Sequence, residues 1–264
     1  MDGTFLNDNG NYNRALYQKA KQMMEERDIV FAPVTGKQCE RVEELFEEDA
    51  KDFWILGDSA TRIKHKNQFV YESLIDNNLG LDIIRFLEKI TPDQTIIACT
   101  KGAAIIKDTV PEKELAIVRG SYAQIQQVAD FSGITDDFIK ITVHDPQLRC
   151  METATKLTPF QNKAYIVASE AAWIDITNSG VHKGTTVQEL QRLLNVSPEE
   201  TMSFGDGYND IELMEHAAFS FAVRNAVQEV KDKSNYITRS NDEDAVLKTI
   251  IQILSLEKNS KIVR

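Results

Sequence analysis

The order of apolar and polar positions predicts alternating helices and strands in the first part of the chain. Helical periodicity runs over residues 13–27, and a second helical pattern covers 39–46. Two apolar runs, 29–34 and 53–56, are predicted to be buried strands. Strands that alternate with helices favour a parallel sheet with helices on its faces.

The same alternation returns in the last third of the chain. We predict helices over 186–194 and 227–233 and apolar strands over 201–204 and 219–223, with a short edge strand at 236–237. Both ends of the chain then contribute to one sheet. The predicted fold class is α/β, with a doubly wound, Rossmann-like parallel-sheet core.

The middle of the chain carries apolar segments of its own. Among them we predict a strand over 115–119 and a helix over 122–131. About 100 residues are enough for a small separate layer. We therefore expect a core domain made of residues 1–76 plus 177–264, with an α+β cap domain inserted at 77–176.

Composition limits the classes of partner. The chain has 264 residues, a formal net charge of −11 and a sequence pI near 4.9, which argues against nucleic acid or an anionic membrane as partner. An anionic substrate then needs local cations or a metal. No apolar stretch approaches membrane-spanning length, no secretion signal is recognisable, and three scattered cysteines indicate a cytoplasmic protein. No pattern indicates the oligomeric state.

The segment 203–210 (Ser-Phe-Gly-Asp-Gly-Tyr-Asn-Asp) concentrates the candidate chemistry. Asp206, Asn209 and Asp210 crowd one turn between a predicted strand and a helical pattern. Two carboxylates and an amide at that position suit a hard cation together with a phosphate. The alternative is an Asx-rich turn, since Asp and Asn are common turn and cap residues. The acidic spacing does not fit an EF-hand.

Further polar residues follow predicted strand ends or open a helix. Thr35-Gly36 follows an apolar run, and Lys183 opens the returning segment. Asp2 joins them if a strand precedes it. Because ligands of open α/β sheets bind outside the carboxyl ends of the strands, these residues predict a metal and phosphate site.

The order Asp2-Gly3-Thr4, Thr35-Gly36, Lys183-Gly184 and 205–210 (Gly-Asp-Gly-Tyr-Asn-Asp) resembles the haloacid dehalogenase superfamily. The inserted module resembles the large cap of its Cof-type phosphatases, and the resemblance covers essentially the whole chain. It implies a Mg²⁺-dependent phosphatase acting on a small phosphorylated metabolite, such as a sugar phosphate. A phosphomutase is a weaker option, because the shared chemistry does not specify the acceptor.

The resemblance also implies roles for individual residues. In the family a carboxylate attacks phosphorus to form an aspartyl-phosphate, and the acid/base role falls here on Asp2, whose backbone carbonyl also faces Mg²⁺. Thr35 holds a phosphoryl oxygen and Lys183 offsets negative charge. Asp206 ligates Mg²⁺ and Asp210 supports the metal shell.

Three residues are assigned to substrate binding on the same resemblance. Gly36 follows the phosphate-binding threonine, Asn209 orients the phosphate side, and Asn225 reaches the phosphate pocket. For Asn225 a helix cap is an equally good interpretation.

One departure from the family is larger than the others. The family's nucleophile stands two residues before Asp2, a position that the printed sequence does not contain. Our interpretation is that Met1 is an internal methionine taken as the start. The chain as printed is then expected to form no aspartyl-phosphate. The alternative is a catalytically silent protein that keeps a phosphate and Mg²⁺ pocket.

Overall fold

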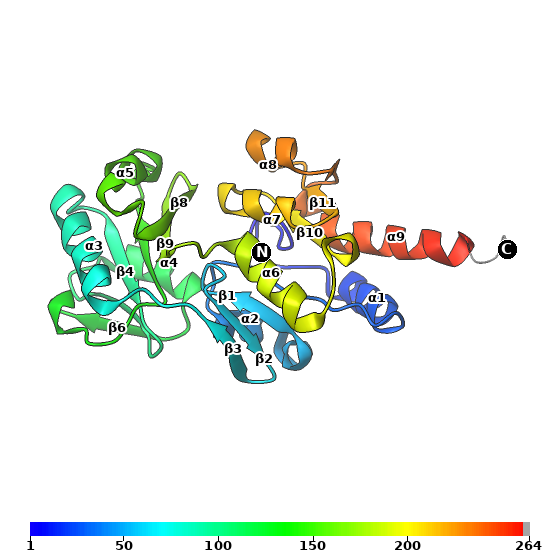
Figure 1. Ribbon diagram of the computed structural model, residues 1–264, viewed down its shortest axis with the longest axis horizontal. Coiled ribbons are helices and arrows are strands. Elements are labelled where there is room, and N and C mark those ends of the chain that lie inside the picture. The colour runs from blue at the N-terminus through cyan, green and yellow to red at the C-terminus, as the bar shows by residue number, and fades with distance from the viewer. Residues whose placement is uncertain (261–264) are drawn as a thin grey trace. The chain divides into compact units, whose positions relative to one another are not determined.

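Figure 1 shows the computed structural model of the chain, which describes residues 1–260, with the side chains of residues 1–256. The chain divides into two compact units. Unit 1 consists of Met1–Ala32 and Gln191–Arg264, and unit 2 of Pro33–Leu190. The predicted cap, 77–176, lies entirely within unit 2, whose bounds are wider. The domain boundaries at 76 and 177 stay predictions.

Unit 1 is a mixed α/β layer. Its helices are α1 (Arg14–Glu25), α7 (Ile211–Glu215), α8 (Gln228–Lys233) and α9 (Ala245–Ser260). Its strands are β10 (Met202–Gly205), β11 (Phe219–Ala222) and β12 (Tyr236–Ile237). The helix α6 (Lys183–Leu194) runs along the chain from unit 2 into unit 1.

The three strands of unit 1 form a parallel sheet in the order β10-β11-β12. The helices α7 and α8 pack on this sheet, and α1 packs against α9, so that segments from the early and late parts of the sequence share unit 1 (Figure 1). The rings of Phe204, Phe221 and Tyr236 stack in a row across the strands. A mixed α/β fold with a parallel-strand core sheet is thereby confirmed.

One strand prediction is wrong at residues 29–34, where the chain passes from unit 1 into unit 2. Residues 29–34 form no strand; Ile29 and Val30 are 42% and 47% exposed. Pro33 has no N–H to donate to a neighbouring strand. Only Val34 pairs, in a single parallel bridge with Leu56. The apolar run is therefore an extended connection, with one point of pairing at its end.

Unit 2 contains two sheets. Its helices are α2 (Cys39–Phe46), α3 (Asn77–Ile90), α4 (Glu112–Ser121) and α5 (Cys150–Lys156). The strands β1 (Trp54–Gly57), β2 (Arg62–His65) and β3 (Gln68–Glu72) form an antiparallel sheet. A six-stranded mixed sheet in the order β6-β5-β4-β7-β9-β8 is built from β4 (Thr95–Cys99), β5 (Ala104–Lys107), β6 (Ile125–Val128), β7 (Lys140–His144), β8 (Ala164–Glu170) and β9 (Trp173–Asn178).

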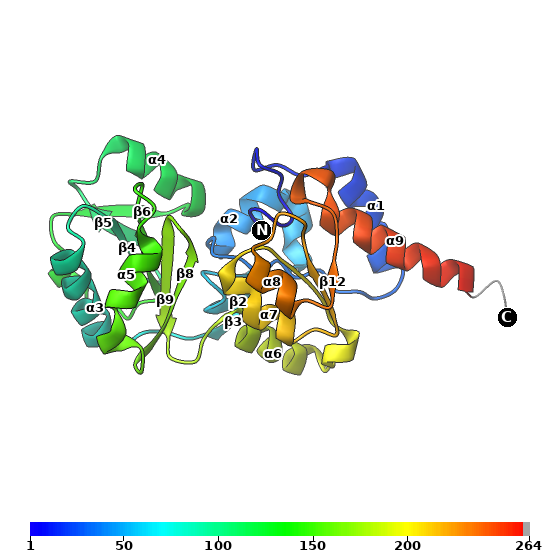
Figure 2. The ribbon, with the colours of Figure 1, turned by 90° about the horizontal axis from the view of Figure 1, so that it is seen from above.

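The six-stranded sheet is covered by helices on both faces. Helices α3 and α5 lie on one face and α4 on the other (Figure 2). The first face buries Ile83 and Leu87 of α3 against Ile141 and Ile174 of the central strands. No helix of the described residues is both long and apolar enough to cross a membrane.

Two predictions in this region are wrong. Residues 115–119 belong to the helix α4, in which Leu115 and Val118 are buried one turn apart behind the N-cap Pro111. Residues 122–131 were predicted as a helix, but they contain the strand β6, which pairs in parallel with β5. The apolar run 115–119 fits a helix and a strand equally well, and 122–131 mixes apolar residues with three glutamines, so periodicity alone could not separate the two states.

The close approach of α3 to the sheet gives a stability prediction. A Cβ at Gly80 would lie 2.1 Å from Cδ2 of the fully buried Phe138 ring. We expect Gly80→Ala to lower the free energy of unfolding by about 1–3 kcal/mol, because the ring has no room to move. Urea unfolding measures the change.

The matched control is Gly120→Ala in α4, where an added Cβ meets nothing within 4 Å. There alanine is expected to stabilise the helix by up to about 1 kcal/mol. Equal effects of the two substitutions would show that the contact with Phe138 is not limiting.

Candidate active site

The sequence-predicted site residues are divided between the two units. Asp2, Asp206, Asn209, Asp210 and Asn225 belong to unit 1. The remaining three, Thr35, Gly36 and Lys183, belong to unit 2. We describe the two sets separately, and their convergence on one ligand stays a prediction.

Asp210 shapes the turn that follows β10. Its carboxylate Oδ2 accepts hydrogen bonds from the backbone amides of Asp206, at 3.0 Å, and of Gly207, at 3.2 Å. Gly205 makes room for this arrangement, since a Cβ there would lie 2.6 Å from Cβ of Asp210. Asp210 is buried and holds the turn in place, and the Asp206 side chain is left out of these two hydrogen bonds.

The N-terminal segment closes on Asp206. The Thr4 hydroxyl donates to Oδ1 of Asp206 across 202 positions of sequence. Gly3 has a positive φ of 65°, and a Cβ there would lie 2.3 Å from Oδ2 of Asp206. Only glycine combines this backbone conformation with so close an approach. The two acidic motifs that the sequence predicts to belong together therefore do meet in unit 1.

Asn225 also holds the N-terminal segment in place, through hydrogen bonds of its side chain. Its side-chain amide donates to the Gly3 carbonyl at 2.7 Å and accepts from the Asn241 amide at 3.1 Å. The N-cap of α8 is Val227, so the helix-cap interpretation of Asn225 is wrong. Asn225 holds the backbone of the Asp-Gly-Thr motif, and its contact with substrate stays a prediction.

The oxygen ligands of unit 1 suit Mg²⁺ in kind. Carboxylate and carbonyl oxygens are what this hard cation prefers, usually with one or two carboxylates and several waters. No group of three His, Cys, Asp or Glu side chains that could hold a metal occurs within the described part of the chain. Asp206 and Asp2 are the residues that would hold the ion, and Asp210, whose Oδ2 accepts from two backbone amides, would support the metal shell.

In unit 2, Thr35 lies where the bridge to β1 ends. Its amide donates to the Leu56 carbonyl at 2.9 Å, and its carbonyl accepts from the Ser59 amide at 3.0 Å. The Thr35 hydroxyl accepts from the Lys37 amide at 3.2 Å. The side chain is buried and oriented by these bonds, as a phosphate-binding hydroxyl needs to be.

Lys183 opens α6 and is buried, with 6% of its surface exposed. One turn later Thr186 donates a hydrogen bond to the Ala60 carbonyl, which ties the start of α6 to the loop after β1. Lys183 also lies within electrostatic range of Asp175 on β9. Unit 2 thus brings Lys183 toward the loops that carry Thr35 and Ser59.

Sequence reasoning missed a buried polar network around Ser59, Lys140 and Asp175. Ser59 donates to Asp175 at 2.8 Å, and the Lys140 ammonium lies 3.3 Å from the same carboxylate oxygen. Burial acts to raise the pKa of the Asp175 carboxyl, but the Lys140 charge outweighs it, with help from Ser59 and Lys183, so the pKa lies below its ordinary value. A charged residue in the middle of an apolar strand is the signal that could have found both charged members.

A second buried carboxylate, Asp58, stands at the start of the same loop. Asp58, Ser59 and Ala60 all have positive φ angles, a conformation that costs non-glycine residues about 1–2 kcal/mol each. Neither carboxylate oxygen of Asp58 has a hydrogen-bond partner among the described residues, and the nearest cation, Arg62, is 3.7 Å away. Burial raises the pKa of the Asp58 carboxyl to about 6, against the charges of Lys140 and Arg62.

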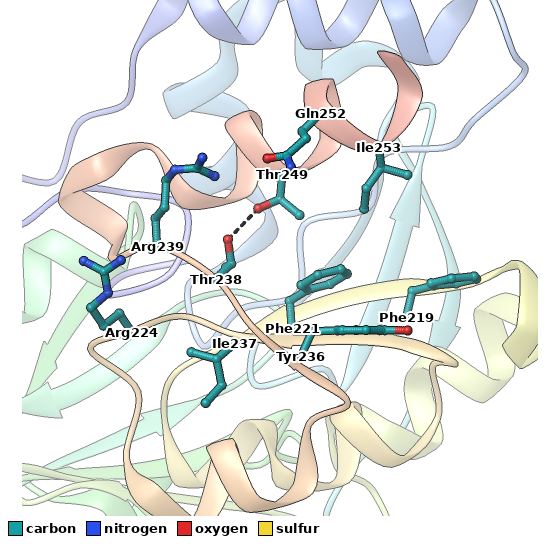
Figure 3. Close-up of a pocket in the computed structure, with 10 residues that line it drawn as sticks. All are labelled: Phe219, Phe221, Arg224, Tyr236, Ile237, Thr238, Arg239, Thr249, Gln252 and Ile253. Atoms are coloured by element: carbon teal, nitrogen blue, oxygen red, sulfur yellow. Dashed lines mark hydrogen bonds between the residues drawn. The ribbon is translucent and has the colours of Figure 1, made fainter. Parts of the chain in front are cut away.

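Unit 1 contains a hollow of about 740 Å³. It opens between α9 and the β11–β12 edge of the parallel sheet, and Figure 3 shows the stacked aromatic side chains that form its floor. None of the sequence-predicted site residues lines it. Its lining is Phe219, Phe221, Arg224, Tyr236, Ile237, Thr238, Arg239, Thr249, Gln252 and Ile253. The hollow therefore does not mark the position of the predicted site residues.

Comparison with known proteins identifies relatives over the full length. The profile of the haloacid dehalogenase-like hydrolases matches residues 1–250. The Escherichia coli protein YbjI, named a 5-amino-6-(5-phospho-D-ribitylamino)uracil phosphatase, is 27% identical over 97% of this chain and 95% of its own.

Solved structures agree with this result. The protein SMU.1108c of Streptococcus mutans superposes with a TM-score of 0.92 at 30% identity, over 97% of both chains. A sugar phosphatase of haloacid dehalogenase subclass IIB has a TM-score of 0.82 at 21% identity, over 96% of both chains, a likeness that shows the fold alone.

The raised pKa of Asp58 predicts a pH-dependent stability difference. The folded-state pKa of about 6 exceeds the ordinary 3.8, so the fold favours the neutral carboxyl. Its contribution is fully present below pH 4 and is lost as the pH rises to 6. The shift of about two units corresponds to about 3 kcal/mol. Asp58→Asn leaves Arg62 paired with Glu72, and should gain about that much stability relative to the unaltered protein between pH 4 and 7.

The control is Asp175→Asn, whose effect has the opposite sign. The pKa of Asp175 is lowered in the fold, so this variant should lose relative stability as the pH rises. Denaturant unfolding at a series of pH values measures both. A pH-independent difference for Asp58→Asn would contradict the assignment.

Proposed function

Because this chain belongs to the haloacid dehalogenase-like hydrolases, we propose that it hydrolyses phosphate monoesters of small metabolites with the help of Mg²⁺. The observation that carries the proposal is the closure of Gly3 and Thr4 on Asp206 in unit 1. It joins the two motifs that such a phosphatase needs for its metal and its acid/base group. The family match over residues 1–250 supports the same activity.

The roles follow from the chemistry of each side chain. An aspartate two positions before Asp2 would attack phosphorus and displace the ester oxygen, which Asp2 would protonate. Water would then attack the aspartyl-phosphate and give its proton to Asp2, releasing inorganic phosphate. The oxygens of Asp206 and Asp2 would hold Mg²⁺, which supplies positive charge to the phosphoryl oxygens. Thr35 and Lys183 would bind and neutralise those oxygens.

The substrate that we propose is a phosphorylated sugar, or a related polyol phosphate. The full-length relative YbjI is named for a phosphorylated ribitylaminouracil, and a structural neighbour is named a sugar phosphatase. These two classes are the first to screen. The cytoplasm is the compartment that fits three buried, free cysteines, Cys39, Cys99 and Cys150.

A second candidate function is binding of phosphate and Mg²⁺ without turnover. Such binding needs only the Asp206 carboxylate and the buried Thr35 hydroxyl, and no attacking carboxylate. Phosphate binding without phosphate release would distinguish this candidate from the enzyme.

The first experiment compares two forms of the protein in Mg²⁺-dependent hydrolysis of p-nitrophenyl phosphate. One form is the printed chain, and the other carries an apolar strand ending in aspartate directly before Met1. Turnover is expected in the extended form, and turnover that needs the added aspartate would identify it as the attacking carboxylate. Turnover by both forms would place the nucleophile elsewhere. Phosphate binding without turnover in either would favour the binding protein.

The acid/base role is tested by Asp2→Asn in the form that turns over. The amide cannot give or take the proton, so kcat should fall by about 10²–10⁴-fold. Asp232→Asn on α8 is the control, since that exposed carboxylate accepts only from Gln228, one turn earlier. A loss of less than threefold at Asp2 would assign the proton transfer to another residue.

A further inference from the structure

Lys140 is a buried lysine in the middle of the six-stranded sheet of unit 2. It lies on β7 and is 1% exposed. Its ammonium donates to the Gly36 carbonyl at 2.8 Å and to the Ser59 hydroxyl at 3.0 Å, and lies 3.3 Å from Oδ1 of Asp175. These three acceptors account for its three N–H donors. Lys140 is therefore fully engaged by protein and has no donor left for a ligand.

The peptide that Lys140 holds is the one between Gly36 and Lys37. A trans peptide keeps its C=O and its N–H on opposite sides. Lys140 binds the C=O on one side, and on the other side the Lys37 N–H donates to the Thr35 hydroxyl oxygen at 3.2 Å. The orientation of this one peptide therefore determines where the Thr35 hydroxyl lies. No acceptor for the hydrogen of that hydroxyl is found within the described residues, so it can donate to a ligand.

Asp175 extends the same arrangement toward Lys183. It lies on β9, directly opposite Thr142 of β7, and accepts from Ser59 and from Thr142. Its carboxylate lies 3.3 Å from the Lys140 ammonium and also interacts electrostatically with Lys183. The buried Asp175 carboxylate thus interacts electrostatically with Lys140, which orients the Thr35 loop, and with Lys183, which opens α6.

We propose that Lys140, held by Asp175 and Ser59, and Asp175 itself are positioning residues for the phosphate site, acting on Thr35 through the Gly36–Lys37 peptide. This inference rests on the proposed function, in which Thr35 and Lys183 bind phosphoryl oxygens. It makes the six-stranded sheet a part of the phosphate-binding machinery. A buried ion pair of this kind adds little stability compared with apolar residues, but it specifies geometry.

The test measures binding of inorganic phosphate to the full chain by isothermal titration calorimetry in the presence of Mg²⁺. Lys140→Gln should weaken phosphate binding by about tenfold or more, within the range of ordinary coupling between sites. Ser59→Ala breaks the central hydrogen bonds without unpairing a buried charge, and should weaken it severalfold. Lys64→Gln is the matched control: Lys64 is also a buried lysine of unit 2, paired with Glu40 and Glu43.

A double variant separates positioning from general loosening of the fold. If Lys140 acts through Thr35, then Lys140→Gln should have little effect on phosphate affinity in a Thr35→Val background. Equal effects in both backgrounds would overturn the inference. Should Lys140→Gln fail to fold, Ser59→Ala in the two backgrounds decides the same question.

The outcomes distinguish this inference from the proposed function. Weaker phosphate binding in Thr35→Val, with normal binding in Lys140→Gln and Ser59→Ala, would overturn the inference and leave the proposed function standing. Normal phosphate binding in Thr35→Val, or no binding by the unaltered chain, would overturn the proposed function and the inference together.

Discussion

Removal of charged side chains from water is the constraint on which both units depend. A buried charge is costly unless donors or an opposite charge surround it. In unit 1 the Asp210 carboxylate meets this requirement with two backbone amides, and so shapes the turn that presents Asp206. In unit 2 Lys140 meets it with two oxygens from loops and one from Asp175. In each unit one partner of the buried charge, Asp206 or Gly36, is a residue of the predicted site.

The local sequence pattern was sufficient to predict the parallel strands of unit 1 and the site residues that meet there. The runs at 201–204 and 219–223 are too short for helices and lead into turn residues, and they are the parallel strands β10 and β11. Chemical type also predicted that the Asp-Gly-Thr segment belongs with Asp206, and the two do meet. Local pattern failed at residues 29–34, where a proline and two exposed apolar residues leave one bridge instead of a strand.

The other half of the site could not be predicted from local pattern, because its contacts are long-range. Lys140 and Gly36 are 104 positions apart, and Ser59 and Asp175 are 116 apart. In the sequence, Lys140 and Asp175 each stand as a single charged residue within an apolar strand, with nothing to indicate that they pair. Only the sheet register, which puts Asp175 opposite Thr142, and the fold of the loop after β1 place the two charges together. The burial of Asp58 could not be predicted either, because it depends on tertiary packing.

The pairing of the two chain ends in unit 1 has a consequence for synthesis on the ribosome. Helix α1 packs against α9, and Gly3 is fastened by Asn225, 222 positions later. Unit 2, which occupies one uninterrupted stretch of chain, is complete as soon as Leu190 has emerged. Domains generally fold as units and in the order in which they appear. The face of α1 that packs against α9 therefore stays uncovered during the synthesis of unit 2, until α9 has been made.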